Sequence, residues 1–135
     1  MKKLLVIMGL SILLPGCALV DAYLMTKYDP NEYKLITEIR ADAQLSKKNC
    51  DDSTASKMNA RIVVNKTHLF ELYSQEVPRN ANVINASKDL HEIAQGLDTR
   101  YNQPNPVSPA YCKLKFESIE NNASTMQHTI GARPR

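Results

Sequence analysis

The chain has 135 residues, of which 43% are hydrophobic and 23% are charged. A chain of this length is one domain's worth of sequence and can bury a core without a structural metal. It carries 17 Lys and Arg against 14 Asp and Glu, for a net charge of +3, and no basic run is longer than two residues. This charge pattern excludes a typical nucleic-acid-binding protein.

The N-terminal residues have the pattern of a targeting segment. Lys2 and Lys3 precede an apolar run, Leu4 to Leu14, that is too short to span a bilayer and remain there. The run ends at Leu14-Pro15-Gly16-Cys17, which resembles the lipobox of bacterial lipoproteins, with Pro15 in place of the usual small residue. A membrane anchor, or a secretory signal followed by an unrelated cysteine, is the alternative interpretation.

The resemblance to lipoproteins implies a division of the chain into three regions. Residues 1–16 are then the signal peptide, residues 17–28 the lipid anchor with a short tether, and residues 29–135 the helical domain. The resemblance also implies cleavage before Cys17 and acylation of its thiol and amino group with fatty acids such as palmitate. Because Ala18 is not the aspartate that retains enterobacterial lipoproteins in the inner membrane, it further implies the periplasmic face of the outer membrane.

The tether is more apolar than the Gly- and Ser-rich linkers that usually follow a lipid anchor. Tyr23, Tyr28 and Tyr33 recur every five residues along it and into the domain. Two placements are open for these rings. They can lie at the membrane–water boundary, which favours amphipathic aromatic side chains, or they can pack against the folded domain.

The first helix is predicted from Pro30 to about Ser46. Asp29 suits its N-cap, proline suits its first turn, and Glu32 has the spacing that completes a capping box. A second helix is expected from residues 51–53 to Pro78, which ends it. Its buried row is predicted to be Ala55, Met58, Ile62, Leu69 and Leu72, interrupted by Asn65 and Lys66 and widened by Val63, Phe70, Tyr73 and Val77.

Two more helices are predicted, one from Asn80 or Asn82 to Tyr101 and one from Ser108-Pro109 to Gly131. Gly96 is expected to mark a close contact between helices. The tail from residue 128 to residue 135, with Arg133 and Arg135, is expected to be solvated and frayed, the alternative being contact with anionic lipid headgroups or peptidoglycan carboxylates. The predicted buried rows are Val83, Ala86, Leu90, Ile93, Ala94, Leu97 and Tyr101, and then Cys112, Phe116, Ile119, Ala123, Met126 and Ile130.

Amphipathic helices joined by short loops predict an all-α fold, an up-down four-helix bundle. This topology places the N-terminal ends of the second and fourth helices at one end of the bundle, and Cys50 and Cys112 with them. An oxidising compartment favours a disulfide between them, the alternative being a buried free thiol at Cys112. Because these two helices are diagonal in a square bundle, either Cys50 reaches across the bundle end or helices two to four form a trio with the first helix alongside.

No catalytic, metal or cofactor site is predicted. His68, His91 and His128 belong to three different helices, and His68-Leu-Phe-Glu71 reverses the Glu-x-x-His pair of di-iron bundles without a second copy. The sequence has no C-x-x-C-H haem motif, no Gly-x-Ser-x-Gly elbow and no glycine loop for phosphate. Met126 is therefore assigned to the core.

These observations favour a non-enzymatic protein-interaction module of the cell envelope, anchored in the lipid bilayer through acylated Cys17 and bound to an envelope protein. The overall plan also resembles small lipoproteins of tailed phages or their hosts, which adds a phage origin to the hypotheses. Two alternatives remain. One is an outer spanin-type subunit in phage lysis, although such subunits are richer in proline; the other is a small envelope enzyme or cofactor-binding bundle.

Overall fold

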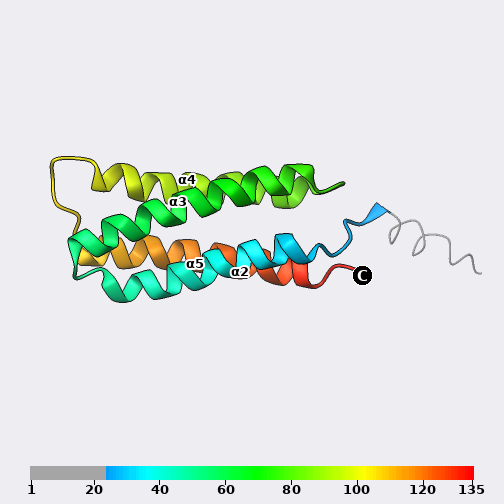
Figure 1. The fold of residues 1–135 in the computed structure, drawn as a ribbon, viewed down its shortest axis with the longest axis horizontal. Coiled ribbons are helices and arrows are strands. Elements are labelled where there is room, and N and C mark those ends of the chain that lie inside the picture. Colours follow the sequence, from blue (N-terminus) through cyan, green and yellow to red (C-terminus); the bar gives the residue numbers. More distant parts are fainter. Residues whose placement is uncertain (1–23) are drawn as a thin grey trace, which may run out of the picture.

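A computed structural model describes residues 24–135, so Cys17 and Tyr23 lie outside the described residues. The helices, labelled as in Figure 1, are α2 (Pro30–Ser46), α3 (Ser53–Glu76), α4 (Ala81–Tyr101) and α5 (Pro109–Gly131), with a 3₁₀ helix η1 (Lys47–Asn49) after α2. Residues 24–135 contain no strand. The predicted all-α class is confirmed.

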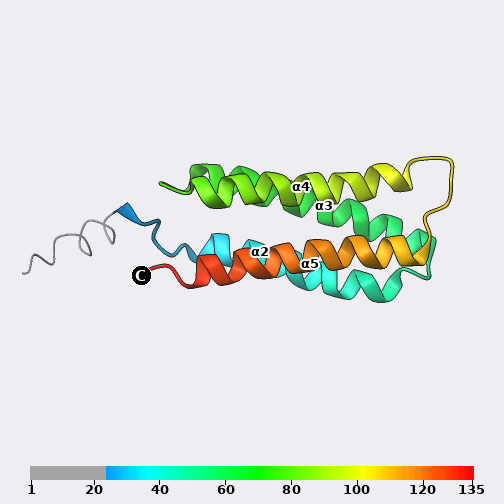
Figure 2. The ribbon, with the colours of Figure 1, turned by 180° about the vertical axis from the view of Figure 1, so that it is seen from behind.

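The four helices form an up-down-up-down bundle. The most extensive contacts join α2 to α5 and α3 to α4, and contacts of α2 with α3 and of α4 with α5 close the square. Figures 1 and 2 show the two pairs as two long layers lying one on the other. Neither diagonal pair is in extensive contact, so the three-helix trio is wrong.

Side chains of the predicted type begin three of the helices. The Asp29 carboxylate accepts from two backbone amides of the first turn of α2, and Asp52 does the same for α3. Ser108 accepts from the amide of Tyr111 at the start of α5. Pro30 and Pro109 occupy the first turn of their helices, where the missing N–H costs nothing.

The core is a single cluster to which every helix contributes. The predicted row of α5 is buried along its whole length, Met126 included. The row of α4 is also confirmed, because its residues are either buried or packed on the core. Phe70 and Phe116 are the largest fully buried side chains.

The predicted buried row of α3 is wrong, because the helix is rotated by roughly half a turn. Its core face consists of Ser56, Ala60, Val63, Thr67, Phe70 and Ser74. The four large residues of the predicted row point outward, with exposed fractions of 63% for Met58, 43% for Ile62, 53% for Leu69 and 48% for Leu72. Val63 and Phe70, which were expected only to widen the predicted row, belong to the core face instead.

Hydrogen bonds explain why Ser56 and Thr67 of α3 face the core, whereas the buried hydroxyl of Ser74 has no hydrogen-bond partner among the described residues. The Thr67 hydroxyl donates to the backbone carbonyl of Val64, and the Ser56 hydroxyl donates to that of Ser53 and accepts from Tyr101 at 2.8 Å. A buried hydroxyl with a partner carries little desolvation cost. Short side chains also let α3 lie close to its neighbours.

The disulfide joins Cys50 and Cys112, with their Cα atoms 5.7 Å apart. Cys50 directly follows η1, which contacts both α2 and α5. The turn before α3 thereby reaches across the bundle end to the first turn of α5. This is one of the two predicted arrangements, and it resolves how diagonal helices share a disulfide.

The two glycines of the helical domain lie in different surroundings, and only the prediction for Gly96 is wrong. Gly96 is exposed, and a Cβ added there would have no heavy atom within 4 Å, so the predicted close helix contact is wrong. Gly131 ends α5 without a left-handed backbone. A Cβ at Gly131 would lie 3.1 Å from the ring of Tyr33, which is the close approach that this position requires.

Candidate functional site

The end of the bundle near residue 24 is closed by a buried ion pair. The side chain of Glu32 is 0% exposed and that of Arg133 is 7% exposed, and Arg133 Nη1 donates to Glu32 Oε2. Asn80 joins the pair: its amide nitrogen donates to Glu32 and to the Ser74 carbonyl, and its oxygen accepts from Arg133 Nη2 at 2.6 Å. Because both side chains are used inside the bundle, Glu32 closes no capping box, and Asn80, although it is the N-cap residue of α4, makes no side-chain capping bond.

The C-terminal tail is bound to this end, so the prediction of a frayed tail is wrong. Besides the Arg133 ion pair, the Tyr28 amide donates to the Pro134 carbonyl at 2.9 Å. The Arg135 guanidinium lies 5.3 Å from the centre of the Tyr28 ring. The buried carboxylate of Glu32 holds the basic tail in place, because it would otherwise lack a counter-charge inside the bundle.

The described tyrosines near the start of the domain pack on the bundle. The rings of Tyr28 and Tyr33 lie 5.8 Å apart, centre to centre, and both are partly buried. The Tyr33 hydroxyl accepts from Gln127 of α5 at 3.3 Å. These two rings therefore contact the folded domain, and their position relative to a membrane stays a prediction.

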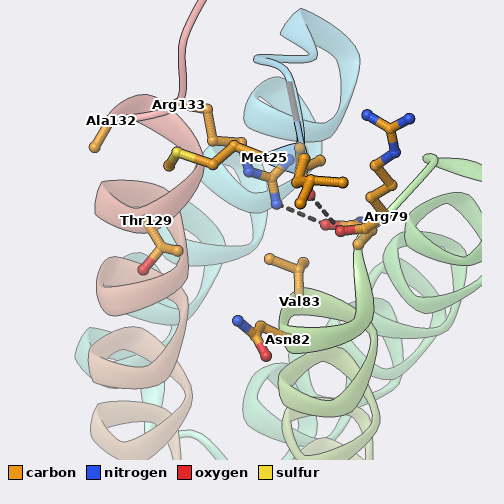
Figure 3. A pocket seen from close by; sticks show the side chains of 10 residues that line it. Met25, Arg79, Asn82, Val83, Thr129, Ala132 and Arg133 are labelled. Atoms are coloured by element: carbon orange, nitrogen blue, oxygen red, sulfur yellow. Dashed lines mark hydrogen bonds between the residues drawn. The ribbon is translucent and has the colours of Figure 1, made fainter. Parts of the chain in front are cut away.

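A hollow of about 450 Å³ opens beside the ion pair, between the start of the described chain, the α3–α4 turn and the end of α5 (Figure 3). Thr26 donates to the backbone carbonyl of Arg79, whose φ of 61° makes a left-handed turn. In Figure 3 Met25 reaches over the hollow towards Arg133, while the Arg79 side chain points away. None of the ten lining residues is a His, Cys, Asp or Glu, so the lining offers apolar and polar contacts without acid–base groups.

A second surface runs along the outside of α3, and we call it the outer row. It consists of Met58, Ile62, Leu69 and Leu72, with Asn65 in the middle, and Leu45 of α2 adjoins it. The spacing alternates between four and three residues, which is that of a helix face packed on another helix. Since the opposite face of α3 is the core, this helix is apolar on two sides.

Ion pairs border the outer row on both sides. Towards α2, Lys66 Nζ lies 2.6 Å from Asp42 and 3.4 Å from Glu38. The hydrogen bond to Asp42 is the main cause that raises the pKa of Lys66. Towards α4, Arg61 Nε lies 3.7 Å from Asp98. An apolar strip with charged edges is the usual anatomy of a protein-interaction surface.

The structure brings together two of the histidines that the sequence analysis treats as separate. One ligand atom each from His68, Glu71 and His91 lies within 4.8 Å of the other two. The pKa of His91 is lowered, mainly by burial of the ring. The neighbouring His68 also lowers this pKa, whereas the carboxylates of Glu71 and Glu92 raise it. His128, in the last turn of α5, is not part of this group.

The spacing of His68 and Glu71 is a signal that the sequence contains, since residues three apart share a helix face. Adding His91 requires knowing which residues of α4 lie beside that turn of α3. The periodicity of either helix alone does not give this register, so the sequence analysis missed the group.

Comparison with known proteins found no matching family model, no matching curated protein and no matching solved structure. Over residues 24–135, no helix combines the length and hydropathy that crossing a bilayer requires. Function is therefore inferred from the surfaces and side-chain groups described above.

Proposed function

We propose that this chain is a bacterial envelope lipoprotein whose helical bundle is a non-enzymatic protein-interaction module. The outer row of α3 is the observation that carries this proposal. Burying a large aliphatic side chain that was fully exposed stabilises a complex by about 1.5–3 kcal/mol. The four apolar side chains of the row are about half exposed, so a partner that covers them gains a substantial part of that energy.

The spacing of the row favours an α-helical segment of an envelope protein as the partner. Side chains alternating at three and four residues fit between those of a second helix with the same pattern. Asn65 sits at the middle of the row, where a polar residue fixes the register of two helices. Lys57 and Arg61 border the N-terminal half of the row, so the matching part of the partner helix carries acidic side chains.

The described chain begins at the bundle end that holds the C-terminus, which supports the proposed anchoring (Figure 1). Acylated Cys17 would hold this end at the periplasmic face of the outer membrane, with Tyr28 on the side of the bilayer. The long axis of α3 then leads away from that end. The outer row is presented to proteins of the periplasm.

Photo-crosslinking in living cells tests the interaction. A photoreactive amino acid replaces Leu69, and the crosslinked envelope protein is identified by mass spectrometry. The same crosslink should disappear when Ile62→Glu and Leu72→Glu are added. It should persist with Leu114→Glu, a matched leucine on α5 that is 63% exposed. Absence of any crosslink at position 69, or equal loss in the control, contradicts the proposal.

Labelling with radioactive palmitate tests the anchor separately. The wild-type chain should incorporate label and sediment with membranes, and Cys17→Ser should lose both properties. A variant with Cys50→Ser and Cys112→Ser serves as the control, because the disulfide cysteines should not affect acylation. Unchanged labelling of Cys17→Ser contradicts the lipoprotein assignment without bearing on the outer row.

A further inference from the structure

His68, Glu71 and His91 form a group that spans two helices at the middle of the bundle. His68 and Glu71 are one turn apart on α3, with Nδ1 and Oε2 separated by 3.9 Å. His91 comes from the adjacent α4, and its ring centre lies 5.1 Å from that of His68. His68 is exposed and the other two side chains are partly buried, so the group is open to ions in solution.

A buried hydroxyl orients the His91 imidazole. Thr67 is 0% exposed, its hydroxyl donates to the Val64 carbonyl, and its oxygen lies 3.0 Å from His91 Nδ1. Since the hydroxyl hydrogen is already used, His91 Nδ1 is the donor in this contact and Nε2 keeps its lone pair. A second hydrogen bond that fixes the tautomer and the ring plane is the usual support of a metal-binding histidine.

We propose that His68, Glu71 and His91 bind a divalent transition-metal ion of the zinc type. Two imidazoles and one carboxylate are a zinc ligand set, whereas calcium and magnesium prefer oxygen ligands alone. Zinc holds its ligand atoms about 3.4 Å apart at bond lengths of about 2.0–2.2 Å. The three ligand atoms lie within 4.8 Å of one another, so zinc binding requires them to approach, and the exposed His68 is the side chain with the most room to move.

Three protein ligands leave one coordination position of a tetrahedral ion open to solvent. His68 and Glu71 alternate along α3 with Leu69 and Leu72 of the outer row. The open position therefore lies at the edge of that row, where water or a donor atom of a bound protein completes the coordination. The metal site itself does not depend on the proposed interaction.

Zinc titration of the full chain tests the site. The protein is purified in detergent, stripped with EDTA, dialysed, and titrated with zinc chloride in competition with a chromogenic chelator. We expect a single saturable site whose affinity falls about tenfold or more in His68→Gln, Glu71→Gln and His91→Gln. Because His68 is exposed, its substitution leaves the fold intact, which circular dichroism checks.

The third histidine provides the matched control. His128→Gln should bind zinc as tightly as the wild-type chain, and magnesium should not compete. The titration is repeated with Cys17→Ser, because an unacylated thiol also binds zinc, and the site should remain. The proposal is overturned if His68→Gln binds like wild type, if His128→Gln weakens binding equally, or if Cys17→Ser abolishes it.

Discussion

Glu32, in the first turn of α2, and Arg133, just after α5, form an ion pair inside the bundle although 101 residues separate them. The pair links the first and last parts of the helical domain at the end where the described chain begins. A charge buried this deeply is tolerated because its partner and Asn80 satisfy it.

Arg133→Met should lower the free energy of unfolding by about 3–5 kcal/mol, because it leaves the Glu32 carboxylate buried without its counter-charge. Urea unfolding followed by circular dichroism measures the change. Arg135→Met is the matched control, since Arg135 only lies over the Tyr28 ring, and it should cost less than about 1 kcal/mol. Adding Glu32→Gln to Arg133→Met should recover part of the loss; equal effects of the two arginine substitutions would contradict the buried pair.

Replacing both Cys50 and Cys112 with alanine should lower the unfolding free energy by roughly 4 kcal/mol, because the disulfide closes a long loop in the unfolded chain. The two cysteines are 62 residues apart in sequence. Urea unfolding with and without reductant measures the effect. Reductant should destabilise the wild-type protein and leave the double variant unchanged. A wild-type protein indifferent to reductant would argue against the disulfide.

Gly96→Ala should stabilise the protein by up to about 1 kcal/mol, since alanine is the better helix former and the new methyl group meets open space. Gly131→Ala should give no such gain, because its methyl group would press on the Tyr33 ring. Thermal unfolding of the two variants compares them directly. A larger gain at position 131 than at position 96 would contradict the described packing.

Two neighbouring residues of α3 should respond in opposite ways to substitution. Leu69→Gln removes an apolar side chain from the surface and should change stability by less than about 0.5 kcal/mol. Phe70→Ala empties a fully buried site and should cost about 3–5 kcal/mol. Urea unfolding distinguishes them, and a larger cost at position 69 would mean that the predicted orientation of α3 was correct after all.

The case of α3 shows where sequence periodicity succeeds and where it stops. In α5 the large apolar residues, such as Phe116 and Ile119, share one row, so hydrophobicity alone identifies the buried face. In α3 two rows have helical spacing, and the richer one points outward. Which row of α3 faces the core depends on hydrogen-bond partners from another helix, such as Tyr101 for Ser56. The local sequence of α3 contains no information about these partners.

The site residues were also predictable only where the prediction did not depend on how neighbouring helices are aligned. The disulfide was predicted from an oxidising compartment, and the predicted topology agreed with it, because alternating helices bring Cys50 and Cys112 to one end of the bundle. The approach of His91 to His68 depends on the register of the α3–α4 hairpin, which periodicity does not define. The Glu32–Arg133 pair was missed because no sequence pattern in a short basic tail indicates that one of its arginines is buried against a carboxylate.

The positions of the disulfide and of the chain ends determine how the domain carries mechanical load. A pull on the chain at residue 24 is transmitted lengthwise along α2, parallel to its contacts with α3 and α5. If α2 is drawn out, the covalent bond from Cys50 to Cys112 passes the tension to α5. When the chain is pulled from residue 24 and from its C-terminus, the segment between the two cysteines therefore bears no tension, and only the residues before Cys50 and after Cys112 can be drawn out.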